Sequence, residues 1–187
     1  MRLTLALFCV ATSARAEAPV DWTRSACLAT KPSSAAHLVR VREGAAWYLK
    51  ADDLEPLADA GGEQLACLDE APRAGTRQRL ILLRANVATL YFVDGAALTE
   101  LPASPSTWKE WREPADESGE TGCLRRFKPG TRLFDRPDGD VVGLVVGRSA
   151  FLGKWSSAKT ATGWWAMTRA RAGGAWVRVP SDRDWCD

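Results

Sequence analysis

The 187 residues carry 25 basic and 23 acidic side chains, a net charge of +2. Arg2 and Arg15 account for this excess, because the first 16 residues contain no acidic residue. Such a balanced chain does not have the broad basic surface that binds nucleic acid or anionic membranes non-specifically.

The first 16 residues have the pattern of a secretory signal peptide. A basic start is followed by the apolar stretch Leu3 to Ala14 and by Ala14-Arg15-Ala16, which supplies the small residues of a cleavage site. Cys9 raises lipid attachment as an alternative, but Phe8 precedes it where a small residue is needed. The apolar stretch is too short to span a bilayer stably, and no later segment is long and apolar enough to do so. We predict cleavage after Ala16 and a periplasmic or secreted protein.

Residues 17–105 are predicted to form a mostly β N-terminal domain. The residues from His37 to Arg42 alternate between apolar and polar side chains, as a half-buried strand does. Trp47-Tyr48-Leu49, Arg79 to Leu83 and Val87 to Val93 are read as further strands.

Two local signals interrupt these strands. Asp52 is a candidate helix cap, and Gly61-Gly62 is a candidate helix end. A short helix is therefore predicted from Asp52 to Ala60, and Pro56 limits its length. Asp94-Gly95 lies between two apolar runs and predicts a β-hairpin.

Residues 106–122 are interpreted as a linker, because the segment from Pro102 to Gly122 holds Pro102, Pro105 and Pro114 and an acidic stretch from Glu113 to Glu120. Thr107-Trp108-Lys109-Glu110 fits a capping box and predicts a short helix that carries Trp108 and Trp111 on one side. Large aromatic side chains in linkers usually pack, so we expect this helix to dock onto a domain.

Residues 123–187 are predicted to be a small closed β-barrel or sandwich, because turn signals separate short β-branched and aromatic runs. Thr131 to Arg136 leads through the turn Pro137-Asp138-Gly139 into Val141 to Val146. Gly163 to Met167 and Gly174 to Pro180 follow as aromatic strands.

This order of a Pro-Asp-Gly hairpin, a Gly-Trp-Trp-Ala-Met strand and a Gly-Ala-Trp-Val strand resembles a Src-homology-3-like domain of the bacterial type. The resemblance covers about a third of the chain. It implies a β-barrel that binds a ligand and performs no chemistry. It does not imply binding of proline-rich peptides, because the paired tyrosines and acidic loop of the eukaryotic domains are missing.

Strand alternation places Trp165 and Met167 on one face and Trp164 and Ala166 on the other. We expect the face with Trp165 and Met167 to be the core. The resemblance then implies that Trp164 lines a groove, beside Pro180. In the alternative, Trp164 packs against the N-terminal half. The candidate ligand-binding residues are Trp164, Phe134, Pro180 and Trp185.

Four cysteines remain after signal cleavage, and an even number in an exported chain indicates disulfides. Three pairings exist; we favour Cys27–Cys67 and Cys123–Cys186, because each pair then holds one half together. No two of these cysteines have the spacing of zinc ligands, so no metal site is predicted.

No catalytic arrangement stands out. His37 is the only histidine and has no nucleophile motif around it. The carboxylates around Asp52 fit a helix start, and those around Asp138 fit a turn. We therefore predict no enzyme activity and no cofactor.

The sequence favours an exported binding module that recognises cell-wall glycopeptide or an envelope protein through its Src-homology-3-like domain. Nine tryptophans, all after the signal peptide, supply side chains that stack on sugars or anchor interfaces. One alternative is an inhibitor or immunity-type protein that blocks a secreted enzyme. A second is a cell-wall hydrolase that uses His37 or the Asp52 cluster.

Overall fold

The computed structural model describes residues 21–22, 24–29, 31, 33–112, 124–181 and 185. Thirteen β-strands and one α-helix lie in these residues, so the prediction of a mostly β chain is confirmed. The predicted signal peptide, residues 113–122 of the predicted linker, and both Cys123 and Cys186 fall outside this part. Within the described residues, no helix is long and apolar enough to cross a membrane.

The elements occur in the following order along the chain. The N-terminal half contains η1 (Ala26–Leu28), β1 (His37–Val41), β2 (Ala46–Trp47), β3 (Ala58–Asp59), β4 (Gln64–Leu68), β5 (Arg77–Arg84), β6 (Val87–Asp94), η2 (Gly95–Ala97), β7 (Leu98–Glu100) and α1 (Pro105–Arg112). The C-terminal half contains β8 (Leu124–Phe127), β9 (Arg132–Phe134), β10 (Val141–Val145), β11 (Ala150–Thr160), β12 (Gly163–Thr168) and β13 (Ala175–Val179).

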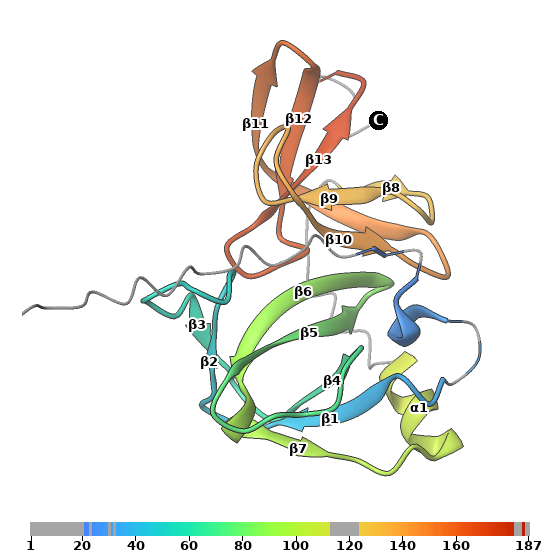
Figure 1. The fold of residues 1–187 in the computed structure, drawn as a ribbon. Coiled ribbons are helices and arrows are strands. Elements are labelled where there is room, and N and C mark those ends of the chain that lie inside the picture. Colours follow the sequence, from blue (N-terminus) through green and yellow to red (C-terminus); the bar gives the residue numbers. More distant parts are fainter. Residues whose placement is uncertain are drawn as a thin grey trace, which may run out of the picture.

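Eleven strands form one antiparallel sheet in the order β7-β1-β4-β5-β6-β10-β9-β13-β12-β11-β8, and β2 pairs with β3 separately. The two halves meet where β6 pairs with β10, with Thr89 opposite Gly143 and Val87 opposite Val145 (Figure 1). The closed barrel predicted for the C-terminal half is not found among the described strands. There, β10 pairs with β6 and β9, and β8 is left as an edge of the sheet.

The hairpin of the N-terminal half lies between β5 and β6, where Ala85 and Asn86 both have positive φ angles of 46° and 64°. Two such residues are typical of a type I′ turn, which matches the twist of the strands. The hairpin predicted at Asp94-Gly95 is wrong. Asp94 instead caps η2, accepting a hydrogen bond from the Ala96 N–H at 2.9 Å, and the chain continues to β7 beside β1.

The helix predicted from Asp52 to Ala60 is also wrong. The Asp53 carboxylate accepts hydrogen bonds from the N–H groups of Leu49 and Lys50, which precede it, and so holds a turn. Beyond this turn, Ala58 pairs with Trp47 to form the small β2–β3 ladder. Tertiary pairing therefore decides the conformation of this segment.

Three buried clusters form the core. The first lies on one face of the N-terminal half and includes the Trp108 and Trp111 side chains, which are 3% and 2% exposed. The rings of these two tryptophans meet edge to face at 5.8 Å, so the predicted helix exists and docks. The second cluster occupies the other face, around Trp47 and Tyr91, and the third fills the C-terminal half around Leu133.

The predicted disulfide between Cys27 and Cys67 is confirmed. It ties η1 to β4 within the first cluster. Asp69 supports the same contact, because its Oδ1 accepts hydrogen bonds from the Ser25 hydroxyl at 2.9 Å and the Cys27 N–H at 3.1 Å. The segment before β1 is thereby held against the sheet.

Replacing both Cys27 and Cys67 with alanine should lower the free energy of unfolding by about 4 kcal/mol. The bridge joins residues 40 positions apart, and its loss restores the entropy of that loop to the unfolded chain. Urea unfolding of the double variant and the oxidised parent measures the difference. A loss under about 1 kcal/mol would mean that η1 and β4 are held together without the bridge.

Replacing Gly143 with valine should lower the free energy of unfolding by about 1–3 kcal/mol. A Cβ at this position would lie 3.0 Å from the Ala88 carbonyl oxygen and 3.4 Å from the Leu133 Cβ, so β10 would be pushed away from β6. Gly61→Val is the matched control, because a Cβ there meets nothing within 4 Å. Equal unfolding midpoints for the two variants would contradict the close approach of β6 and β10.

Candidate binding cleft

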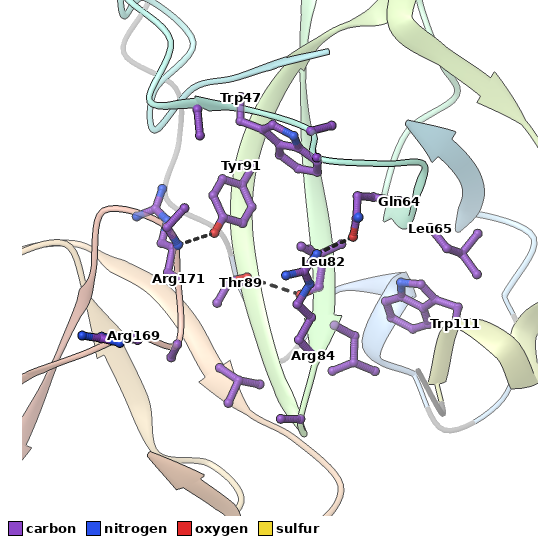
Figure 2. Close-up of a pocket in the computed structure, with 18 of the residues that line it drawn as sticks. Trp47, Gln64, Leu65, Leu82, Arg84, Thr89, Tyr91, Trp111, Arg169 and Arg171 are labelled. Atoms are coloured by element: carbon purple, nitrogen blue, oxygen red, sulfur yellow. Dashed lines mark hydrogen bonds between the residues drawn. The ribbon is translucent and has the colours of Figure 1, made fainter. Parts of the chain in front are cut away.

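A cleft of about 640 Å³ opens where the two halves meet. One wall comes from β4, β5 and β6, and the other from β11 and the segment 169–172 that follows β12 (Figure 2). The polar and aromatic side chains that line it include Tyr91, Arg84, Phe151, Arg169 and Arg171. The site is therefore built by both halves of the chain.

Tyr91 connects the two walls. Its ring is buried and meets Trp47 edge to face at 5.0 Å, which fixes the ring on β6. Its hydroxyl oxygen accepts a hydrogen bond from the Ala172 N–H at 2.8 Å. Because the hydroxyl is buried away from water, the pKa of Tyr91 is raised above its ordinary value of 10.0. The phenol stays neutral and anchors the segment 169–172.

Arg171 is a buried cation at the same junction, with 4% of the residue exposed. Its guanidinium carbon lies 5.2 Å from the centre of the Tyr91 ring, and Nη2 lies 3.5 Å from the Leu49 carbonyl oxygen. Burial lowers the pKa of Arg171, although the neighbouring Tyr91 hydroxyl and the carboxylates of Asp135 and Asp53 oppose this. Arginine remains protonated in proteins, so Arg171 adds positive charge near the cleft.

Arg84 and Arg169 are the exposed cations of the cleft. Arg84 ends β5 and donates a hydrogen bond to the Gln64 Oε1 at 2.5 Å. Arg169 follows β12, and its guanidinium carbon lies 5.6 Å from the centre of the Trp155 ring. In the part of the chain that the structure describes, neither arginine forms an ion pair with a carboxylate. Asp59 and Glu110 are the acidic residues that also line the cleft.

Two aromatic side chains are exposed next to these arginines. Phe151 lines the cleft and is 56% exposed, and Trp155, four residues further along β11, is 58% exposed. Neither residue was predicted to belong to a strand or a site. The signal that was available is the run Phe151-Leu152-Gly153-Lys154-Trp155, which places large aromatic residues in a polar stretch. The cleft and this pair form a continuous surface through Arg169.

The structure divides the predicted ligand-binding residues between several places. Trp164 is half-buried beside the C-terminal core, with the Lys159 ammonium 5.4 Å from its ring centre. Val179 lies opposite Trp164, so the exposed Pro180 follows close by. Phe134 packs edge to face against Trp165 at 5.2 Å. Trp185 is 3% exposed and packs against Phe127 at 5.5 Å, so it contributes to the core.

Both faces of β12 carry a buried side chain, Trp165 on the predicted core face and Ala166 on the other. Trp165 and Met167 do share a face, but Ala166 lies in the C-terminal core and Trp164 packs against that cluster. Trp165 is buried on the opposite side by Phe134 and by hydrogen bonds from its indole N–H to the hydroxyls of Thr160 and Thr162. Both faces of β12 are thus covered, and alternation alone does not show which one is the core.

The residues weighed for catalysis have structural contacts. The His37 Nδ1 lies 2.6 Å from the Glu100 Oε1 on the neighbouring strand β7. Asp138 accepts hydrogen bonds from the hydroxyls of Thr160 and Thr162, which joins two turns of the C-terminal half. No group of His, Cys, Asp and Glu side chains that could hold a metal ion occurs in the described residues.

Tyr91→Phe should lower the free energy of unfolding at pH 7 by about 1 kcal/mol, because the Ala172 N–H loses its acceptor. Because the pKa of Tyr91 is raised in the folded protein, the phenol of the unfolded chain ionises first as the pH rises. The contribution of Tyr91 to the free energy of unfolding is therefore fully present below about pH 10 and decreases above it. The variant should therefore show a shallower alkaline decrease. Urea unfolding at pH 7 and pH 10.5 measures both effects.

Tyr48→Phe is the control for this substitution, because it keeps an aromatic ring under the Arg77 guanidinium, 3.4 Å from the ring centre. At pH 7 the control should lose less free energy of unfolding than Tyr91→Phe does. Equal losses in the two variants would show that the Tyr91 hydroxyl does not connect the two halves.

Comparison with known proteins identifies no relative of this chain. No protein-family model, no curated protein and no solved structure matches it. Its function is therefore inferred from the side chains at the cleft.

Proposed function

We propose that this protein is an exported, non-enzymatic module that binds cell-wall glycopeptide. The observation that carries the proposal is the pair Phe151 and Trp155, each more than half exposed beside a cleft. Single exposed apolar residues are common, but two large aromatics next to a concave surface are typical of a binding site. The Cys27–Cys67 bridge supports export, because such bridges persist in oxidising compartments.

A saccharide suits this surface because exposed aromatic rings offer flat apolar faces with a fixed orientation. Trp155 lies between Lys154 and Ser156, which both pair with β12, so its position is restrained from both sides before the ligand arrives. Binding therefore costs little ordering entropy at this residue. The glycan would lie along Phe151 and Trp155, with its substituents directed toward the cleft.

The C-terminal half is proposed to be a Src-homology-3-like module, as its sequence motifs suggest. The antiparallel hairpin of β9 and β10 around the Pro-Asp-Gly turn supports this, as does the antiparallel pairing of β12 with β13. The expected groove on Trp164 becomes a second proposed contact, with Pro180 beside it. Trp164 is partly covered by the core, whereas Phe151 and Trp155 are open to solvent.

The proposal predicts that Trp155→Ala and Phe151→Ala each weaken binding to insoluble peptidoglycan by about tenfold or more, as exposed aromatic anchors at binding sites do. The measurement is the fraction of purified, oxidised protein that sediments with sacculi over a range of sacculus concentrations. Trp164→Ala tests the second proposed contact, which is expected to contribute less because Trp164 is partly covered by the C-terminal core, whereas Phe151 and Trp155 are open to solvent. It should retain at least half of the parent affinity.

Three outcomes would contradict this assignment in different ways. Loss of binding in Trp164→Ala alone would move the site to the Trp164 surface. Absence of sedimentation for the parent protein would reject the cell-wall ligand. A tight one-to-one complex with a secreted enzyme, together with no sedimentation, would favour the inhibitor.

A further inference from the structure

We infer that strand β8 completes the saccharide site, and that this site holds a linear chain of sugars rather than a single sugar. The inference rests on the proposed function, because it names the length and the path of the saccharide. Its basis is the outer face of β8 and β11, which carries Leu124, Arg126, Phe151 and Trp155. A ligand on this face would contact both strands.

Strand register and exposure agree on which residues form this face. Phe151 lies opposite Arg126 and both are exposed, whereas the neighbouring Phe127 and Leu152 are buried in the C-terminal core. Directly opposite residues of an antiparallel pair project from the same side of the sheet. Leu124, two residues before Arg126, is 38% exposed and lies on that side as well. These side chains on β8 therefore extend the surface that Phe151 begins.

Two observations place Trp155 on the same side as Phe151. Trp155 comes four residues later on β11, and an even spacing keeps the side along a strand. Independently, Arg169 lines the cleft together with Phe151, and its guanidinium carbon lies 5.6 Å from the centre of the Trp155 ring. From the rise of a strand and the bulge, the Cα atoms of Phe151 and Trp155 are about 11–13 Å apart. One sugar ring cannot cover both side chains, but successive sugars of one chain can.

Each of these aromatic rings has an arginine beside it. Arg126 is directly opposite Phe151, so their Cβ atoms are about 5 Å apart. Arg169 lies by the Trp155 ring, on the wall of the cleft that the C-terminal half supplies (Figure 2). An aromatic ring packs on the apolar face of a sugar, and guanidinium N–H groups donate to its hydroxyl and carbonyl oxygens. The same pair of groups thus occurs twice along β11, which suits a ligand built of repeating sugars.

The position between the two aromatic rings also suits a continuous chain. Gly153 occupies it on β11 and adds no side chain there. Leu124 lies opposite Gly153 on β8 and supplies an apolar surface beside it. A chain that leaves Phe151 toward Trp155 would therefore pass over Gly153 and along Leu124.

The experiment measures the affinity of the parent protein for peptide-free glycan fragments prepared from sacculi: a single sugar, one disaccharide and three disaccharides. Titration calorimetry should show that the longest fragment binds at least tenfold more tightly than the single sugar, because two aromatic contacts replace one. In Trp155→Ala and in Phe151→Ala this gain should fall below about threefold. A gain that came only from more binding positions on a longer fragment would remain in both variants. Ser157→Ala changes an exposed residue of the same strand and should keep the full gain.

Arg126→Gln tests the contribution of β8, since it removes the guanidinium opposite Phe151 and leaves both aromatic rings in place. It should weaken binding of the longest fragment about tenfold. Arg132→Gln is the matched control, because Arg132 is an exposed arginine of the same half on β9. This control should bind as the parent does. Thermal unfolding confirms that each variant is folded.

The outcomes separate the inference from the proposed function. Equal affinity of the parent for all fragments overturns the extended site, and so does a length gain that persists in Trp155→Ala and Phe151→Ala. Binding of intact sacculi without binding of any peptide-free fragment also overturns it, because the ligand would then be the peptide of the cell wall. Equal losses in Arg126→Gln and Arg132→Gln would remove β8 from the site. Absence of binding to intact sacculi rejects the proposed function itself.

Discussion

Strand β6 is the element on which the rest of the structure depends, because it pairs with β5 on one side and β10 on the other. Its side chains also enter all three buried clusters: Ala88, Leu90 and Phe92 the first, Tyr91 and Val93 the second, and Val87 the third. One strand of eight residues therefore connects the cores of both halves. Moving β6 would disturb packing throughout the described chain.

The cleft is a consequence of this connection. The strand pairing brings the end of β5 close to the segment 169–172, and the hydrogen bond from the Ala172 N–H to the Tyr91 hydroxyl fixes their separation. Leu57 and Gly173 make a further contact between the halves, since a Cβ at Gly173 would lie 3.1 Å from a Leu57 methyl carbon. A site with walls from both halves cannot exist if the halves move independently.

The sequence predicted those features that depend on neighbouring residues. The strands β1, β5 and β6 follow from alternation and apolar runs. The helix α1 was predicted from a capping box at Thr107, but it begins at Pro105, and the Ser104 hydroxyl accepts the hydrogen bond of the Thr107 N–H. The Cys27–Cys67 pairing follows from the small number of choices. The Ala85-Asn86 turn was missed, because alanine is unusual at positive φ and the strands on each side impose that conformation.

The features that were not predicted depend on distant partners. Nothing near Val141 indicates that β10 pairs with β6, since both strands are apolar runs that suit several neighbours. That both faces of β12 are covered was missed for the same reason: alternation separates Trp164 and Ala166 from Trp165, but it does not show that the C-terminal core covers the first pair while Phe134 packs on Trp165. The candidate cleft was inaccessible to sequence analysis because it requires both of these arrangements.

The exposure of Trp155 follows from an irregularity in β11. The register between β11 and β12 shifts between Lys154 and Ser156, so Trp155 is the extra residue of a bulge. A bulge redirects a side chain, and here the redirected side chain is a large aromatic that points to solvent beside Arg169. Exposing this ring gives up the stabilisation that its burial would provide. The bulge thus leaves a large aromatic ring exposed beside Arg169, which lines the cleft.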